Sequence, residues 1–319
     1  MTTGKGCDWI DYADRETKTE RKEQRQEQEI EWISLALYMM RHKPGSNMSE
    51  IKKYAVMGNP VSHSLSPQIH HFFGEQCGIR LEYRAILVET GRFKSAVRQF
   101  IDEAGNGLNI TVPFKQEAWQ LADLRSNRAE LAGAANTLMF EENGNIFGDN
   151  TDGVGILRDI TNNLGRPVAD AKVLVIGAGG AVRGVLGPLL DDGPSLLHIV
   201  NRTASKAREL ETVFGEFGPC TSGGLDDIGD APYDIIINGT AASLQGKIPG
   251  LPASIFTDQS LAYDMMYGRE QMPFLVWAGE NGSGLCSDGL GMLVEQAAES
   301  FYIWHGVRPE TKPVIQALR

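Results

Sequence analysis

The sequence predicts an α/β fold with two domains, and three observations carry that prediction. The chain has 319 residues, enough for two cores of ordinary size. From Met48 onward, short apolar runs alternate with stretches of helical character, a pattern typical of sheets covered by helices. The run Lys172 to Ile176 is rich in β-branched residues without polar alternation, as expected for a strand buried on both faces of a parallel sheet.

Composition narrows the class of protein. The net charge of −11 argues against broad binding of nucleic acid or of acidic membranes. The four cysteines lie far apart and form no Cys/His cluster, so we expect a reduced protein without a metal site. No apolar run has transmembrane length, and the acidic start is unlike a signal peptide. We therefore expect a cytoplasmic protein.

Residues 1–47 differ from the rest of the chain. The stretch Thr17 to Glu31 is a dense mixture of charged and amide side chains with little apolar content. Such a stretch buries too little to hold itself in place, so we expect an N-terminal extension that is poorly ordered, and a functional protein that starts at Met48. The alternative is an interaction helix that uses the apolar residues Trp32, Ile33, Leu35 and Leu37.

The first predicted domain covers residues 48–151. Gly78 and Gly105 are expected to end its first two helices, and Asn143-Gly144 signals a hairpin between its last two strands. Its expected elements, in order, are a strand at Tyr54–Met57, a helix at Pro67–Cys77, a strand at Leu81–Val88, a helix at Phe93–Ala104, a strand at Leu108–Val112, helices at Gln116–Leu124 and Asn127–Ala132, and strands at Thr137–Glu141 and Asn145–Gly148.

The second predicted domain covers residues 152–288 and repeats strand–helix units, which favours a doubly wound parallel sheet. A helix at Gly291–Trp304 is apolar on one face, and residues 289–319 are expected to return to the first domain and complete it. The expected elements before it are a helix at Val154–Leu164, strands at Lys172–Ile176, Leu197–Val200, Asp234–Ile237 and Leu261–Met265, and a helix that ends at Leu190.

A glycine-rich turn follows the buried strand Lys172–Ile176. Gly177, Gly179 and Gly180 allow the backbone to approach a pyrophosphate at a helix N-terminus, although Val182 breaks the strict dinucleotide pattern. The next strand ends in Asn201-Arg202-Thr203, with Lys206 nearby, where an NAD site would have an acid for the ribose. Amide and guanidinium groups suit a 2′-phosphate instead, so we predict NADP over NAD.

Polar residues in the first domain suggest a second ligand. Ser64 and Ser66 lie in a loop before Pro67, a residue that suits a helix start, so two hydroxyls and helix-start N–H groups can face one anion. Thr111 and Lys115 follow a strand, at the edge where ligands bind in open α/β folds. Taken singly, Lys115 is typical of a solvated helix start, Asp152 of a helix cap and Asn136 of a turn.

Taken together, these residues resemble a known family. From about Met48 to its end the chain is similar to shikimate dehydrogenase. The matching motifs, in order, are GNPVSHSLSP, NITVPFK, LAGAANTL, GDNTDGVG, VIGAGGAVRGV, NRT, DMMY and DGLGMLVEQA. The resemblance implies a substrate-binding α/β domain, a Rossmann-like NADP domain, and reduction of 3-dehydroshikimate to shikimate in chorismate and aromatic amino-acid biosynthesis.

The resemblance also implies roles for single residues. Lys115 is implied as the catalytic proton carrier beside Asp152. The residues implied to bind shikimate are Ser64, Ser66, Thr111, Asn136, Asp152, Tyr267 and Gln296. Those implied to bind NADP are Gly177, Ala178, Gly179, Gly180, Ala181, Asn201, Arg202, Thr203, Lys206, Met265 and Gly289. His63, inside the serine loop, is interpreted as structural because no second ligand or carboxylate partner is apparent.

Several alternatives stay open. A lysine in hydrogen-bond reach can move the proton that accompanies hydride transfer, or it can act only through its charge. A quinate/shikimate dehydrogenase that accepts NAD is the nearest rival enzyme. A ligand sensor without catalysis is the rival of another class, although Lys115 and Asp152 both remain. The sequence leaves a monomer and a homodimer equally possible.

Overall fold

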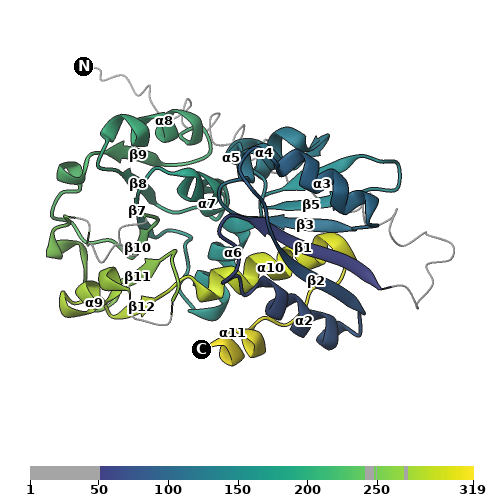
Figure 1. The fold of residues 1–319 in the computed structure, drawn as a ribbon. Helices are drawn as coiled ribbons and strands as arrows, with labels where there is room; N and C mark the ends of the chain where they lie inside the picture. Colours follow the sequence, from purple (N-terminus) through teal and green to yellow (C-terminus); the bar gives the residue numbers. More distant parts are fainter. Residues whose placement is uncertain (1–50, 241–247, 249, 269–271) are drawn as a thin grey trace, which may run out of the picture. The chain divides into compact units, whose positions relative to one another are not determined.

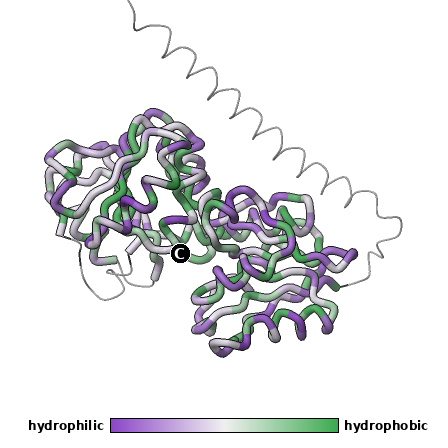
Figure 2. The backbone as a smooth tube through the Cα atoms, turned by 90° about the horizontal axis from the view of Figure 1, so that it is seen from above, coloured by the Kyte–Doolittle hydropathy of each residue, from purple (hydrophilic) through white to green (hydrophobic). Residues whose placement is uncertain are grey.

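The computed structural model describes residues 51–240, 248, 250–268 and 272–319, and within them it contains two six-stranded sheets (Figure 1). The predicted extension at 1–47 lies outside the described residues. In Figure 2 the hydrophobic stretches run mainly through the interior of the fold, whereas hydrophilic stretches lie mostly on its outside. No helix in the described residues is long and apolar enough to cross a membrane.

The first sheet is mixed and has the order β2-β1-β3-β5-β6-β4. Strands β2, β1 and β3 run parallel, β5 is antiparallel to both β3 and β6, and β4 is parallel to β6. The hairpin predicted around Asn143-Gly144 is confirmed as the β5–β6 connection. The strands are β1 Lys52–Gly58, β2 Leu81–Leu87, β3 Gly107–Ile110, β4 Leu124–Arg125, β5 Thr137–Phe140 and β6 Ile146–Asp149.

The helices of this sheet are α2 Ser66–Cys77, α3 Phe93–Asp102, α4 Lys115–Leu121 and α5 Asn127–Ala132. Two predicted ends are wrong. Helix α3 ends at Asp102, and Ala104, rather than Gly105, adopts the left-handed φ of 62°. Helix α4 ends at Leu121, and the last predicted helical residue, Leu124, begins strand β4 because it pairs with β6.

The second sheet is parallel throughout, with strands β7 Lys172–Ile176, β8 Leu196–Val200, β9 Cys220–Gly223, β10 Ile235–Asn238, β11 Leu261–Asp264 and β12 Leu285–Ser287. Counted from β7, its order is 3-2-1-4-5-6, the doubly wound order of dinucleotide-binding sheets, so the predicted fold class is confirmed. Strands β9 and β12 were not predicted. Its helices are α7 Gly180–Asp191, α8 Ala204–Phe214 and α9 Pro273–Glu280.

Two helices connect the chain's sheet-forming segments. Helix α6 (Asp152–Arg158), which continues as a π-helical turn over Asp159–Asn163, packs against α7 and against α10 (Leu290–His305). Helix α10 also packs against α2, and α11 (Lys312–Leu318) follows it. The predicted helix at Val154–Leu164 therefore starts two residues earlier, at Asp152, and loses α-helical geometry at Asp159.

Candidate active site

A cavity of about 320 Å³ lies at the carboxyl edge of the mixed sheet. Its volume is at the low end of the range for small-molecule sites. Ten of the residues predicted for the site line it: Ser64, Ser66, Thr111, Lys115, Asn136, Asp152, Met265, Tyr267, Gly289 and Gln296. The structure thus brings together segments that are more than two hundred residues apart in the sequence.

The closest polar contact in this cavity joins Lys115 and Asp152. Lys115 Nζ lies 2.5 Å from Asp152 Oδ2, and the two side chains are 26% and 10% exposed. Lys115 is the first residue of helix α4, and Asp152 is the first residue of helix α6, in which Thr151 occupies the capping position. The ammonium is therefore held at a fixed point of the cavity wall with part of its surface open to a ligand.

Asn136 is the hydrogen-bonding centre of the cavity wall. Its Nδ2 donates to Asp152 Oδ1 at 2.8 Å and to Thr151 Oγ1 at 2.9 Å, and its Oδ1 accepts from the Thr151 backbone N–H at 2.9 Å. The distance from Nδ2 to Gln296 Oε1 is longer, 3.3 Å. Asn136 is 2% exposed, so these bonds fix the carboxamide and through it the second oxygen of Asp152.

The serine loop leads directly into α2. Ser66 is the first residue of the helix and is 6% exposed, and its backbone N–H donates to Ser64 Oγ at 3.3 Å. The capping residue, Leu65, offers no side-chain hydrogen bond, and the positive end of the helix dipole faces the loop. Across the sheet edge, Thr111 Cγ2 would lie 2.3 Å from a Cβ on Gly58, so glycine at position 58 permits this close approach.

The opposite wall comes from the loops that follow β11 and precede α10. Met265 and Gly289 meet closely, because a Cβ on Gly289 would lie 2.4 Å from the Met265 carbonyl oxygen. Tyr267 lines the cavity beside them, and burial raises the pKa of its phenol, so this side chain stays a neutral donor at physiological pH.

The glycine-rich turn lies at the end of β7, at the point where the order of the parallel sheet reverses. Gly177 has a φ of 115°, a backbone angle that residues with a side chain rarely adopt, and a Cβ at this position would lie 3.2 Å from Thr240 Cγ2. Gly179 caps α7, and a Cβ on Gly179 or Gly180 would meet no atom of the described residues within 4 Å. Backbone N–H groups at a helix start with open space in front of them fit a pyrophosphate.

The predicted phosphate-binding residues follow β8. Asn201 is half-buried and its Nδ2 donates to the Thr203 carbonyl at 2.9 Å, whereas Arg202, Thr203 and Lys206 are exposed. These residues, like Gly177 to Ala181, do not line the cavity. They follow the carboxyl ends of β7 and β8, the edge at which dinucleotides bind in doubly wound sheets.

Comparisons with known proteins identify the family of this chain. Three family models match: the shikimate dehydrogenase substrate binding domain at residues 56–138, shikimate / quinate 5-dehydrogenase at 159–245, and the shikimate 5'-dehydrogenase C-terminal domain at 289–319. The shikimate dehydrogenase (NADP(+)) of Hahella chejuensis is 52% identical over 83% of this chain and 98% of its own length. The chain belongs to the shikimate dehydrogenase family.

Other similar proteins match nearly the same share of this chain. The enzyme of Methylococcus capsulatus is 50% identical over 85% of this chain and 97% of its own length. Among solved structures, an Ael1 enzyme from Pseudomonas putida is 47% identical with a TM-score of 0.80, covering 84% of this chain and 98% of its own. The Thermus thermophilus shikimate 5-dehydrogenase, solved with NADP(H) and shikimate, is 32% identical with a TM-score of 0.75, covering 84% and 98% of the two chains.

The sequence analysis did not assign to the site two residues that line the cavity in the structure. His63, interpreted as structural, has an exposed side chain that lines the cavity. Asn109 also lines it, and its Nδ2 donates to Ser300 Oγ at 2.9 Å. Asn109 begins the NITVPFK motif, which is the signal that points to it. Within the described residues, no group of three or more His, Cys, Asp or Glu side chains could hold a metal ion.

Proposed function

We propose that this protein catalyses the NADP-dependent, reversible reduction of 3-dehydroshikimate to shikimate. The observation that carries the proposal is the Lys115–Asp152 pair, 2.5 Å apart in the wall of a small cavity. The names of relatives that align over 97–98% of their own length support the same activity and cofactor.

The substrate carboxylate is assigned to Ser64 and Ser66. Two hydroxyls and a helix start can hold an anion although the chain's net charge is −11. The ring hydroxyls of the substrate are assigned to other polar residues that line the cavity. These residues are Thr111, Asn136 and Asp152, with Tyr267 and Gln296 completing the pocket.

Lys115 is assigned the proton transfer. Reduction of a ketone places negative charge on its oxygen, and an ammonium in hydrogen-bond reach neutralises that charge by donating a proton. Asp152 holds Nζ in place, and the hydrogen bond from Asn136 holds Asp152. The reverse reaction uses the same groups, with the neutral amine of Lys115 as the base.

The cofactor is assigned to the crevice of the parallel sheet. When bound, NADPH supplies the hydride. The turn from Gly177 to Ala181 would hold the pyrophosphate, and Asn201 to Lys206 the 2′-phosphate, because amide, hydroxyl and cationic groups are gathered there without an acid at the strand end. Met265 and Gly289, which line the cavity, would contact the reactive end of the cofactor.

The domain division follows from these assignments. We propose a substrate domain at 48–151 completed by 289–319, and a cofactor domain at 152–288. The mixed sheet with α10 supports the first part and the parallel sheet supports the second. A cytoplasmic location, and the choice between monomer and homodimer, stay predictions.

The first test is an absorbance assay of the purified protein with shikimate or quinate, each with NADP⁺ or NAD⁺. We expect strong turnover with shikimate and NADP⁺ and weak turnover with the other three pairs. Turnover of quinate or use of NAD⁺ at comparable rates would identify the broader quinate/shikimate dehydrogenase activity. Binding of shikimate without turnover of any pair would favour the ligand sensor.

A further inference from the structure

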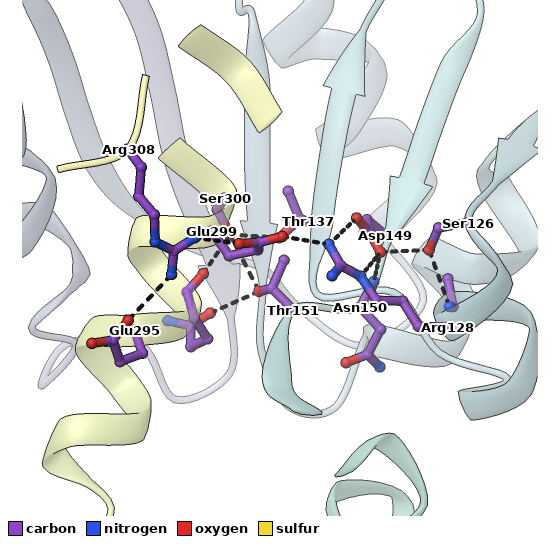
Figure 3. A network of polar contacts seen from close by, with 12 residues as sticks. Ser126, Arg128, Thr137, Asp149, Asn150, Thr151, Glu295, Glu299, Ser300 and Arg308 are labelled. Atoms are coloured by element: carbon purple, nitrogen blue, oxygen red, sulfur yellow. Dashed lines mark hydrogen bonds and ion pairs between the residues drawn. The ribbon is translucent and has the colours of Figure 1, made fainter. Parts of the chain in front are cut away.

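A cluster of charged side chains, of which the carboxylates are buried and the arginines half-buried, is shown in Figure 3, and none of its members lines the cavity. We call it the arginine–carboxylate cluster; it consists of Arg128, Asp149, Glu295, Glu299 and Arg308. Arg128 binds Asp149 through two hydrogen bonds, Nε to Oδ1 at 2.7 Å and Nη2 to Oδ2 at 2.6 Å. The same Nη2 lies 3.1 Å from Glu299 Oε1.

The other arginine continues the cluster along α10. Arg308 donates to Glu299 Oε2 through Nη1 and to Glu295 Oε2 through Nη2 at 3.2 Å. Burial alone would raise the pKa of Glu299, but Arg128 and Arg308 outweigh it and the net pKa is lowered, so Glu299 is ionised.

The cluster joins two segments that carry substrate-site residues. Asp149 is the last residue of β6, and the turn that follows it leads to Asp152 at the start of α6. Glu295 and Glu299 lie on α10 on either side of Gln296. Arg128 thus adds a charged contact between the turn that leads to Asp152 and helix α10, besides the direct packing of α6 against α10.

Gln296 depends on this placement because its own bonds in the cavity are long. Its Oε1 lies 3.3 Å from Asn136 Nδ2 and 3.4 Å from Thr151 Oγ1. Its Nε2 donates to the Leu293 carbonyl of the same helix at 2.8 Å, so the carboxamide is fixed to α10 and its position in the cavity is set by where α10 lies. Buried ion pairs are in general poor sources of stability compared with apolar packing, and a role in fixing geometry is their better-attested use.

We propose that Arg128 and Glu299 are positioning residues that hold α10 against the Asp152 turn, so that Gln296 and Asp152 contact the same substrate molecule. This inference rests on the proposed function. It predicts that weakening the cluster harms the use of shikimate and largely spares the use of NADP⁺, because the residues assigned to the cofactor's phosphates follow β7 and β8 of the other sheet.

The test is a KM comparison for Glu299→Gln and Arg128→Lys. Glu299→Gln keeps the size of the side chain and leaves each arginine one carboxylate, and Arg128→Lys keeps the charge but loses the two-pronged contact. We expect the KM for shikimate to rise about tenfold in both, with the KM for NADP⁺ within twofold of wild type. Glu130→Gln is the matched control. Glu130 lies on α5, the helix that carries Arg128, and pairs with Arg125 of β4 at 3.1 Å. We expect both KM values of this variant to stay unchanged.

A double variant separates positioning from general damage. If Glu299 acts through Gln296, adding Glu299→Gln to Gln296→Ala should change the KM for shikimate less than twofold further. Three results would overturn the inference. The KM for shikimate could stay unchanged in the folded single variants, or the KM values for shikimate and NADP⁺ could rise equally. In the double variant, the two single effects on the KM for shikimate could multiply in full. Should Glu299→Gln not fold, Arg128→Lys decides the same question. Inactivity of the wild type with shikimate would instead overturn the proposed function.

Discussion

The two sheets of this protein place polar groups differently. In the parallel sheet, the buried polar residues Asn238 and Asp264 are the last residues of β10 and β11, and they bond each other at 2.9 Å. In the mixed sheet, Asn109, Thr137 and Asp149 lie in register across β3, β5 and β6. The antiparallel strand β5 therefore brings the residue that precedes it, Asn136, to the edge where β3 and β6 end.

This difference separates two kinds of binding site. At a parallel edge, strand ends and helix starts offer mainly backbone groups, which suit a cofactor that is the same in many enzymes. The mixed edge adds side chains from a strand start, and here it assembles Lys115, Asn136 and Asp152 within hydrogen-bonding distance. The chemistry and the substrate choice should therefore depend on the mixed sheet, and the cofactor choice on the parallel one.

The largest effect should come from removing the ammonium at the mixed edge. We expect Lys115→Ala to lower kcat by about 10²–10⁴-fold, the usual range for a positioned proton donor, and to weaken shikimate binding far less. Steady-state kinetics and shikimate titration measure the two quantities. As the contrasting variant from the parallel sheet, Arg202→Gln should raise the KM for NADP⁺ and leave kcat nearly unchanged. A large loss of shikimate binding with near-normal kcat in Lys115→Ala would refute the assignment.

The two sheets also differ in how far the sequence predicted them. The apolar runs of β7 and β10 predicted a parallel sheet because strands covered on both faces carry a clear composition. Strands β9 and β12 have four and three residues, of which several are small or polar, so no pattern marked them. Their pairing comes from neighbours in the sheet, which local sequence does not encode.

The roles of the residues in the candidate site came from the family resemblance, because the local sequence around each residue did not indicate them. Read singly, Asn136 was typical of a turn, and its role as the bonding centre depends on the antiparallel β5. The arginine–carboxylate cluster had no signal at all, because Arg128 and Glu299 are 171 positions apart and each looks like an ordinary surface charge. Contacts of that range come from tertiary structure alone.

A tight contact at the parallel edge gives the next prediction. A Cβ on Gly239 would lie 2.3 Å from Val182 Cγ2 and 3.1 Å from Met265 Sδ, so Gly239→Ala overpacks this edge. We expect a loss of about 1–3 kcal/mol in the free energy of unfolding, the usual cost of an extra buried methyl group. Val182→Ala removes the clashing methyl groups, so the double variant should recover most of the loss in urea denaturation. No recovery would place the strain at Met265 instead.

The smallest expected effect between neutral pH and pH 5 is a loss of stability towards unfolding, and we expect it to arise beside the mixed sheet and not in the parallel sheet. His70 is fully buried, and among the residues that the structure describes neither of its ring nitrogens has a hydrogen-bond partner; its ring stacks on that of Tyr83 with ring centres 4.3 Å apart. Burial, with a further contribution from the nearby His305, lowers the pKa of His70 to about 3. In the parallel sheet, His198 differs because its Nδ1 lies 2.7 Å from the Tyr233 hydroxyl.

Because the folded-state pKa of His70 lies below its ordinary value of 6.5, the unfolded chain takes up a proton first as the pH falls. Stability from neutral His70 is complete above about pH 6.5 and decreases below it by up to about 1.4 kcal/mol per pH unit, down to the folded pKa. Urea denaturation at pH 7.5, 6 and 5 should show this slope, and His70→Phe, which keeps a stacked ring, should reduce it. A slope unchanged in His70→Phe, or removed instead by His198→Phe, would show that the acid-sensitive group lies in the parallel sheet.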